Sequence, residues 1–189
     1  MKKTSLFLFI WMTVLTGILY PLCITLIAQL TMPKKANGSL LLVDDKTIGS
    51  TLLAQKFETD RYFWPRPSAV DYNPLPSGGS NLGPTSATLK ELVRAREDKL
   101  KNSHRSAQSV PSELLFASGS GLDPHISPIT AIYQVERIVK ARKLDETGKQ
   151  KIMELIANMT TARQFGFLGT SYVNVLELNH ALDQIKATP

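Results

Sequence analysis

The strongest constraint on this chain is an uncharged stretch near its start, from Thr4 to Pro33. Its central part, residues 6–30, is mostly Phe, Ile, Trp, Leu and Val, and it is long enough for a helix to cross a bilayer. A cleaved signal peptide has a shorter apolar core that ends at a small-residue cleavage site. A lipoprotein signal would need a small residue in place of Leu22, just before Cys23. We therefore predict a retained membrane anchor over residues 1–32.

The charges beside this anchor set its orientation only weakly. Lys2 and Lys3 precede it and Lys34 and Lys35 follow it, so the positive-inside rule is nearly balanced. A long domain crosses a membrane largely regardless of its charge. We predict that the N-terminus lies in the cytoplasm and the domain outside. Cys23 is the only cysteine, so no intrachain disulfide can form.

The remainder is predicted to be a linker at residues 33–38 and one soluble domain at residues 39–189. Apolar residues make up 43% of the chain and charged residues 20%, which is typical of a folded domain. The formal net charge is +6, but the Lys and Arg residues are scattered and do not form a basic stripe with aromatic residues. This distribution argues against nucleic acid as a partner.

The domain is predicted to be α+β and helix-rich, with a few short strands. Residues 39–43 predict a buried strand, residues 49–56 a short helix and residues 113–116 a short strand or turn. Four helix starts are indicated by capping patterns at Thr88 with Glu91, Ser127 with Pro128, Thr147 with Gln150, and Asn174 with Glu177. The apolar faces of the last three helices are predicted to contain Ile129, Ile132, Val135 and Val139, then Ile152, Leu155, Ile156 and Met159, and finally Leu178, Ala181, Leu182 and Ile185.

Residues 117–128 form the most distinctive polar segment of the domain. Gly119 and Gly121 permit backbone angles closed to other residues, while Pro124 and Pro128 fix theirs. The loop leads into a helix N-terminus, where free N–H groups favour an anion or a carbonyl-rich partner. The alternative is a buried turn whose Asp and Ser side chains bond its own backbone. The residues alone leave both interpretations open.

No complete catalytic or metal-binding pattern appears elsewhere. Ser120, Asp123 and His125 contain the residue types of a hydrolase triad, but they lie close together on one loop without a nucleophile elbow. The three histidines, His104, His125 and His180, are far apart, and there is neither a phosphate loop nor an aspartyl-phosphate signature.

Four sequence blocks together resemble a known family. They are Arg66-Pro67-Ser68, Ser77-Gly78-Gly79-Ser80-Asn81, the long block Ser118–Ser127, and Val173-Asn174-Val175-Leu176 with Leu178-Asn179. With the N-terminal span, they make the chain similar to the C subunit of the Kdp potassium-transporting ATPase of bacteria. The resemblance covers almost the whole chain.

The resemblance implies a non-catalytic accessory subunit in the bacterial inner membrane. Its implied partners are a potassium-channel-like subunit, a P-type ATPase subunit and membrane lipid. The family is described as a chaperone that raises the ATP affinity of the ATPase subunit through a ternary complex with nucleotide. An external domain cannot meet cytosolic ATP, so we favour the assembly role; the residues themselves assign no cofactor, and ATP enters only through the resemblance.

The binding or interface residues that the resemblance implies come from these same blocks. They are Arg66, Pro67, Ser68, Ser80, Asn81, Ser118, Gly119, Ser120, Gly121, Asp123, Pro124, His125, Ser127 and Asn174. The competing hypothesis is a membrane-anchored enzyme or small-ligand-binding domain that uses the Ser118–Ser127 loop. An enzyme's loop should act in the isolated domain, whereas a subunit should show little activity without its complex.

Overall fold

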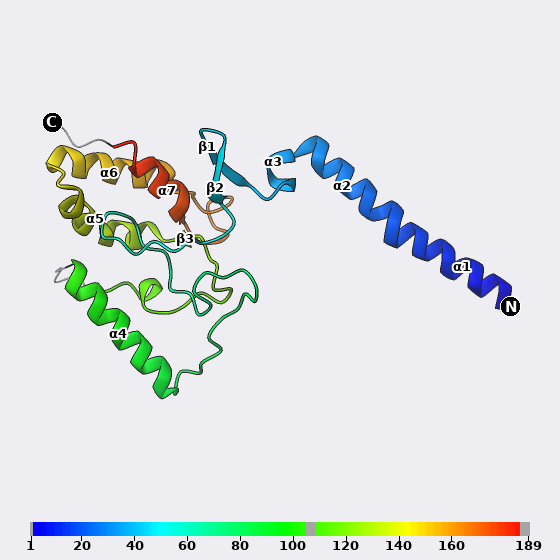
Figure 1. The fold of residues 1–189 in the computed structure, drawn as a ribbon, viewed down its shortest axis with the longest axis horizontal. Helices are drawn as coiled ribbons and strands as arrows, with labels where there is room; N and C mark the ends of the chain where they lie inside the picture. Colours follow the sequence, from blue (N-terminus) through cyan, green and yellow to red (C-terminus); the bar gives the residue numbers. More distant parts are fainter. Residues whose placement is uncertain (1, 105–108, 186–189) are drawn as a thin grey trace. The chain divides into compact units, whose positions relative to one another are not determined.

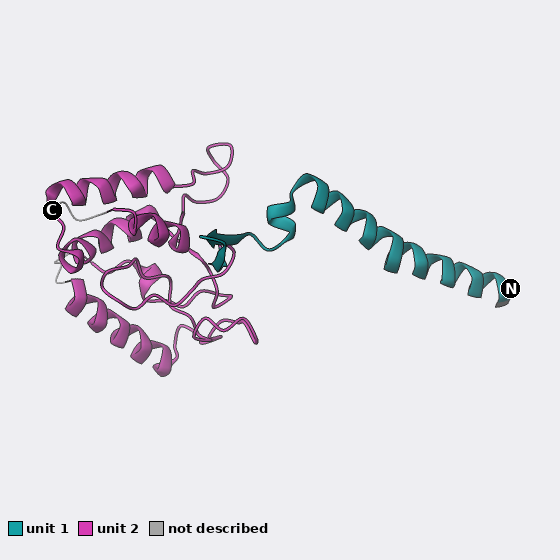
Figure 2. Cartoon of the chain, turned by 45° about the horizontal axis from the view of Figure 1, so that its top comes forward, with its two compact units in different colours: residues 1–50 teal, residues 51–189 magenta. Residues whose placement is uncertain are grey.

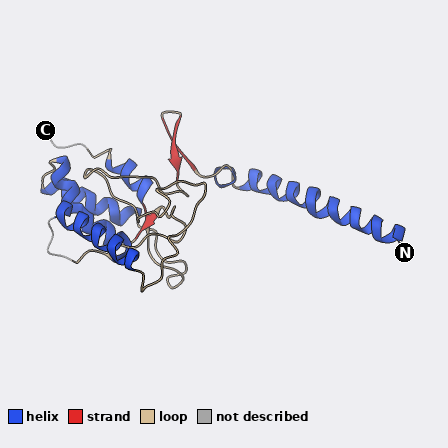
Figure 3. Cartoon of the chain, turned by 60° about the horizontal axis from the view of Figure 1, so that its bottom comes forward, coloured by secondary structure: helices blue, strands red, loops and turns tan. Residues whose placement is uncertain are grey.

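The computed structural model describes residues 2–104 and 109–185 (Figure 1). The chain divides into two compact units, residues 1–50 and 51–189 (Figure 2). Helices form most of the regular structure and the strands are short (Figure 3). The predicted fold class is therefore confirmed: one apolar N-terminal helix followed by a helix-rich α+β domain.

The apolar stretch of the first unit forms a nearly continuous helix. It consists of α1 (Lys2–Val14), a π-helical turn η1 (Leu15–Leu19) and α2 (Tyr20–Thr31). The helix over Lys3–Thr31 contains an 18-residue window with a mean hydropathy of 2.1 and is long and apolar enough to cross a membrane. The π-helical turn lies just before Pro21, whose ring removes a helical N–H donor.

The first unit ends in a small β-hairpin. After the short helix α3 (Pro33–Ala36), β1 (Leu40–Val43) pairs antiparallel with β2 (Lys46–Ser50). Asp44 and Asp45 both have positive φ angles, 48° and 61°, as a two-residue hairpin turn requires.

Two predictions for this region were wrong. The strand exists, but it is not buried, because Leu40 and Leu42 are exposed. Residues 49–56 are not a helix, because residues 46–50 form β2 and the chain continues as a turn. Leu41 and Val43, on the other face of the strand, are only half-buried, and a run of leucines does not show how much of a strand is covered.

The elements of the second unit in chain order are α4 (Ala87–His104), a 3₁₀ turn η2 (Ser112–Leu114), β3 (His125–Ile126), α5 (Pro128–Arg142), α6 (Glu146–Met159), β4 (Val173–Asn174) and α7 (Val175–Leu182). In this unit, α6 packs against both α5 and α7, and α4 packs against α5 on the other side of the unit (Figure 1). The short strands β3 and β4 pair antiparallel, with His125 opposite Asn174 and Ile126 opposite Val173.

The apolar core of this unit comes mainly from α5, α6 and α7. Its fully buried members include Phe63, Ile138, Ile152, Ile156, Leu178 and Leu182. A second cluster joins α4 to α5 through Trp64, Leu100, Leu114 and Tyr133. The predicted apolar faces of α6 and α7 are confirmed. The predicted face of α5 is partly wrong: Val135 is buried and Val139 half-buried as predicted, but Ile129 and Ile132 are exposed, and Ala131 and Ile138 are buried in their place.

The helix caps explain where the predicted boundaries held and where they shifted. Ser127 and Asn174 are the N-caps of α5 and α7, as predicted, and each accepts a hydrogen bond from the amide three residues later. The caps at Thr88 and Thr147 were wrong. The α4 helix begins after Ser86, whose hydroxyl accepts from the Leu89 amide, and α6 is capped by Asp145.

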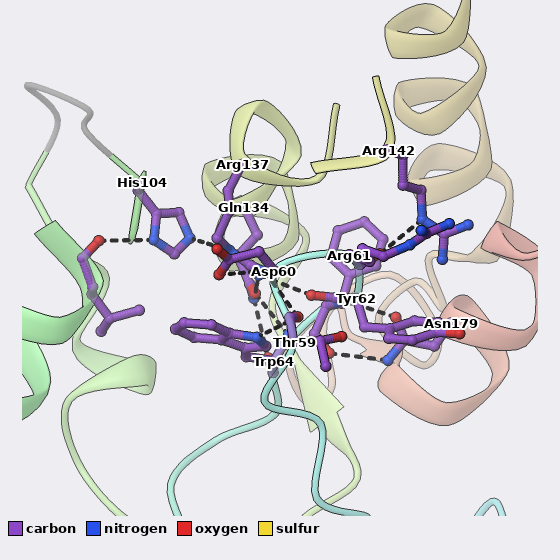
Figure 4. A network of polar contacts seen from close by, with 12 residues as sticks. Thr59, Asp60, Arg61, Tyr62, Trp64, His104, Gln134, Arg137, Arg142 and Asn179 are labelled. Atoms are coloured by element: carbon purple, nitrogen blue, oxygen red, sulfur yellow. Dashed lines mark hydrogen bonds and ion pairs between the residues drawn. The ribbon is translucent and has the colours of Figure 1, made fainter. Parts of the chain in front are cut away.

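An irregular segment, residues 59–64, is held in the middle of the second unit by helix side chains (Figure 4). Asn179 accepts a hydrogen bond from the Phe63 amide (2.8 Å) and donates to the Phe63 carbonyl (3.0 Å). Gln134 makes the same pair with Trp64, at 2.8 and 3.1 Å. Because a buried backbone must find partners for its polar groups, these two amides permit a non-regular segment to enter the core.

Two arginines also donate hydrogen bonds to the carbonyls of this segment. Arg137, whose side chain is only 1% exposed, donates to the carbonyls of Thr59 (3.3 Å) and Tyr62 (2.9 Å) and stacks over the Trp64 ring at 4.1 Å. Arg142 donates to the Arg61 carbonyl at 2.8 Å. Burial lowers the pKa of Arg137 to about 10, so it remains charged at neutral pH.

His104 joins α4 to this network in its neutral form. Its Nε2 accepts a hydrogen bond from Arg137 Nε (3.2 Å), and its Nδ1 lies 2.9 Å from the Leu100 carbonyl oxygen. This geometry requires a ring protonated only at Nδ1. Burial, followed by the charge of Arg137, lowers the pKa of His104 from 6.5 to about 4.

We predict that this histidine makes the domain less stable in acid. Between about pH 4 and 6.5 the unfolded chain binds a proton that the folded chain does not. The free energy of unfolding should therefore be highest above about pH 6.5. It should decrease by about 1–3 kcal/mol as the pH is lowered from 6.5 to 4. Denaturant titrations of the full chain in detergent would measure it, with His104→Gln as the non-titrating control. Equal pH slopes for the two proteins would contradict the prediction.

Candidate functional site

The other three family-like blocks all contact the Ser118–Ser127 loop. The Ser118 amide donates to the Pro67 carbonyl at 3.0 Å, which joins the loop to the Arg66 segment. A Cβ atom built on Gly79 would lie 3.0 Å from the Gly119 carbonyl oxygen, and one built on Gly121 would lie 2.7 Å from the Gly78 carbonyl oxygen. The backbones of residues 66–68, 78–79 and 118–121 are therefore in direct contact.

Arg66 and Asp123 form the central charge pair of this site. Arg66 Nη1 lies 2.9 Å from Asp123 Oδ2, and both side chains are about 30% exposed. Burial alone would raise the pKa of Asp123, but hydrogen bonds from His125 and Arg66, with the charge of Arg66, outweigh it and lower the pKa. Asp123 is therefore an ionised anchor for the loop. Pro65 and Pro67 flank Arg66 and fix the backbone that presents it.

His125 is held by the carboxylate and by an aromatic ring. Its amide donates to Asp123 Oδ1 at 3.0 Å, and its Nδ1 lies 3.5 Å from the same oxygen. Its ring packs edge-on against Tyr172 at 4.4 Å between centroids. Asn174, the last predicted site residue, lies opposite His125 in the β3–β4 pair and donates from Nδ2 to the Thr51 carbonyl at 2.7 Å.

The end of the loop is fixed to its surroundings by backbone and capping bonds. The Pro124 carbonyl accepts from the Val175 amide at 2.9 Å, and the Ser127 amide donates to Glu113 Oε2 at 2.9 Å. Ser127 Oγ meanwhile accepts from the Thr130 amide at the start of α5. The loop thus connects the beginnings of α5 and α7.

The arrangement does not resemble a nucleophile with its base. Ser120 Oγ accepts a hydrogen bond from the Leu122 amide at 3.1 Å, and across the described residues no hydrogen bond joins Ser120 to His125. Within the same residues, no group of three His, Cys, Asp or Glu side chains could hold a metal ion. Ser120 and Asp123 accept hydrogen bonds from amides of the loop itself, as the buried-turn interpretation requires, and Asp123 also pairs with Arg66 outside the loop.

Some predicted residues lie apart, and some contributors were not predicted. Ser80 and Asn81 are exposed, and Asn81 has a positive φ of 53°. Tyr72 was missed: it donates from its hydroxyl to the Arg66 carbonyl at 2.9 Å, and burial raises its pKa to about 12. Glu113 was also missed, because its partner Ser127 lies 14 residues away and no local pattern links them.

A cavity of about 190 Å³ lies beside the Arg66 segment. It is lined by Trp64, Pro67, Ser68, Tyr72 and three cations, Lys56, Arg96 and Lys99. The cations already have partners: Lys56 pairs with Asp71 at 2.8 Å, Arg96 donates to the Leu115 carbonyl at 2.7 Å, and Lys99 lies over Trp64 at 4.9 Å.

These observations define a class of protein: a chain with one candidate membrane helix and a helix-rich domain in which the Ser118–Ser127 loop contacts several other segments. Comparison with known sequences identifies the family. Residues 2–184 match the KdpC family, described as the K⁺-transporting ATPase c chain. The chain belongs to this family, and the resemblance seen in the sequence blocks is confirmed.

Relatives match along nearly their whole length. The potassium-transporting ATPase KdpC subunit of Sorangium cellulosum is 49% identical over 185 residues, which cover 96% of each chain. That of Methylococcus capsulatus is 45% identical over 189 residues, covering 98% of this chain and 97% of the relative. That of Paraburkholderia phytofirmans is 45% identical over 183 residues.

We predict that Gly121→Ala destabilises the domain strongly and that Gly119→Ala does not. Gly121 has a φ of +71°, and a Cβ there would meet the Gly78 oxygen and Val70 Cγ2, each at 2.7 Å. Overpacking together with the left-handed backbone should cost about 2–4 kcal/mol. At Gly119 nothing lies within 4 Å of an added Cβ.

Thermal and denaturant unfolding of the two full-chain variants would measure this difference. Gly119→Ala is the matched control, since it adds the same methyl group to the same loop. Equal stability of the two variants would show that the Gly78–Gly121 contact is not tight in solution.

Proposed function

We propose that this chain is an accessory subunit of an ATP-driven, high-affinity potassium uptake complex of the Kdp type. The observation that carries the proposal is the family match over residues 2–184, with relatives of 45–49% identity named as subunits of a potassium-transporting ATPase. Its partners in this proposal are a channel-like subunit that conducts K⁺ and a P-type ATPase subunit that hydrolyses ATP. The helix Lys3–Thr31 holds the chain in the inner membrane beside them.

Within the complex, the subunit is proposed to act through shape rather than chemistry. The support is the use of the loop's own polar groups: Asp123 is paired with Arg66, Ser120 binds the Leu122 amide, and Ser127 caps α5. A group that already holds the fold together is poorly placed to exchange protons with a substrate. The same contacts fix the outline of the loop, which suits a surface that must match a partner.

The domain is proposed to lie outside the cell, on the far side of the membrane from ATP. In that topology a role in ATP affinity would have to act through the ATPase subunit, without direct contact between this domain and nucleotide. Assembly and stabilisation of the complex are therefore the primary role proposed here. A membrane-anchored enzyme or small-ligand binder that uses Ser118–Ser127 is the competing function.

The topology gives one prediction. A cysteine in place of Asn158, an exposed residue of α6, should react with a membrane-impermeant thiol reagent on whole cells, in a Cys23→Ser background. The labelled chain should keep its original N-terminus and need detergent for extraction, because the anchor is retained. Labelling only after lysis would place the domain in the cytoplasm and make direct contact with ATP possible. A shortened, soluble labelled chain would exclude the anchor.

A second prediction separates subunit from enzyme. Ser120→Ala removes one neutral hydrogen bond, and His125→Ala removes a long contact (3.5 Å) to the Asp123 carboxylate, so each change should cost on the order of 1 kcal/mol. Potassium uptake by cells that depend on the complex should therefore change by less than about tenfold. In contrast, Arg66→Met should reduce recovery of the co-purified complex, since it leaves Asp123 without its cation.

The measurements are potassium uptake and the subunits that co-purify with each variant. If His125→Ala leaves the complex intact but lowers uptake by orders of magnitude, the loop has a chemical role and the proposal is wrong. If the wild-type chain purifies from membranes without potassium-transport subunits, membership of such a complex is contradicted.

A further inference from the structure

Residues 161–172, between α6 and β4, form a second hairpin, which we name the Phe165 hairpin. The Thr161 and Tyr172 amides donate to each other's carbonyls at 2.9 and 3.1 Å, and Gln164 and Leu168 do the same at 3.0 and 2.9 Å. Its tip carries Phe165 and Phe167, which are 86% and 72% exposed. Leu168 beside them is also exposed. The hairpin therefore presents an apolar tip on a backbone held by two bridging pairs.

The backbone conformation at the tip is unfavourable for the residue that occupies it. Phe165 has a φ of 52°, a backbone region that favours Gly, Asn or Asp over aromatic residues. Its ring gains no compensating burial among the described residues. Neither the backbone nor the packing of this chain accounts for a phenylalanine here. A contact outside the chain does account for it, because such a contact would bury Phe165 and Phe167 together.

The charge of the region indicates what this contact is. From Leu155 to Leu176 the sequence has a single charged residue, Arg163, and no acidic residue. Arg163 lies directly beside the hairpin's inner pair, next to Gln164. An apolar aromatic tip with an adjacent cation is suited to a membrane surface, where the rings enter the interfacial region and the cation meets lipid phosphates.

A short run of residues connects the base of this hairpin to the apolar helix. The hairpin is followed directly by β4, in which the Asn174 side chain bonds the Thr51 carbonyl at 2.7 Å. Immediately before Thr51, Ser50 Oγ donates to the Gly38 carbonyl at 2.7 Å, so the β1–β2 hairpin begins and ends at one point. Only Met32–Gly38 separates this point from the end of α2, and seven residues reach at most about 25 Å.

We propose that the Phe165 hairpin is a second membrane contact: its tip inserts into the anionic headgroup region of the bilayer that holds the anchor. The short tether gives the tip a high effective concentration at the surface, so a weak insertion suffices. This inference goes beyond the proposed role as a transporter subunit and does not depend on it. A protein socket on a partner is the other possible occupant, and the test distinguishes the two.

The test uses the full chain, with Cys23→Ser and Phe167→Cys, labelled with an environment-sensitive fluorophore. The protein is placed in vesicles of phosphatidylcholine and phosphatidylglycerol with its domain outward. The matched control carries the same label at Asn158→Cys, on exposed α6. At position 167 we expect severalfold stronger quenching by nitroxide-labelled lipid and severalfold weaker quenching by aqueous iodide than at position 158. Phe165→Asn, a residue favoured at this φ, should weaken both differences without unfolding the domain.

The role of charge is tested with Arg163→Gln and with vesicles that lack phosphatidylglycerol. Each change should reduce the lipid quenching at position 167, and the reduction should be smaller at high salt. Equal iodide access at positions 167 and 158, with no lipid quenching, would overturn the proposal. Protection that appears only when partner subunits are present, again without lipid quenching, would also overturn it and identify a protein socket. Neither outcome depends on transport activity.

Discussion

Two amide side chains hold the domain together at one point. Gln134 of α5 and Asn179 of α7 each bond both backbone groups of a residue in the extended segment Phe63–Trp64. Gln134 Oε1 also accepts from Arg137, but the other polar atoms of the two amides find their partners in this segment, which has no sheet to pair with. An unsatisfied buried polar group costs about 1–3 kcal/mol, so removing either amide would leave the backbone groups of the residue it bonds without partners. The position of Arg66, two residues further on, follows from this arrangement.

The candidate site is positioned by this anchored segment. Arg66 pairs with Asp123, and Asp123 organises the loop that starts α5 and touches the start of α7. The loop in return caps α5 through Ser127 and bonds the first residue of α7 through the Pro124 carbonyl. A change in the conformation of this loop would therefore change the positions of both helices. Such coupling suits a subunit that a partner recognises by its shape. Mobile loops that close over substrates can move without shifting the elements beside them.

The sequence predicted those features that depend on local chemistry. The apolar helix, the Ser127 and Asn174 caps, and the buried faces of α6 and α7 each follow from a short pattern. Prediction from the sequence failed where the residues that an element contacts lie far along the chain. Leucines in β1 looked buried, and Ile129 looked like part of a core face, because periodicity does not show what an element packs on. Gln134, Arg137 and Asn179 could not be selected as core groups, since their partners are backbone atoms at least 70 residues away.

The hydrogen bond between Ser50 Oγ and the Gly38 carbonyl gives the connection between membrane helix and domain a mechanical character. It closes the base of the β1–β2 hairpin, so pulling on the two ends of the hairpin would strain this bond together with the first strand pair, Leu40 with Ser50. An antiparallel hairpin pulled from both ends opens one pair at a time. The 12 residues 39–50 would then release up to about 40 Å of chain. The connection therefore lengthens when its own hairpin opens.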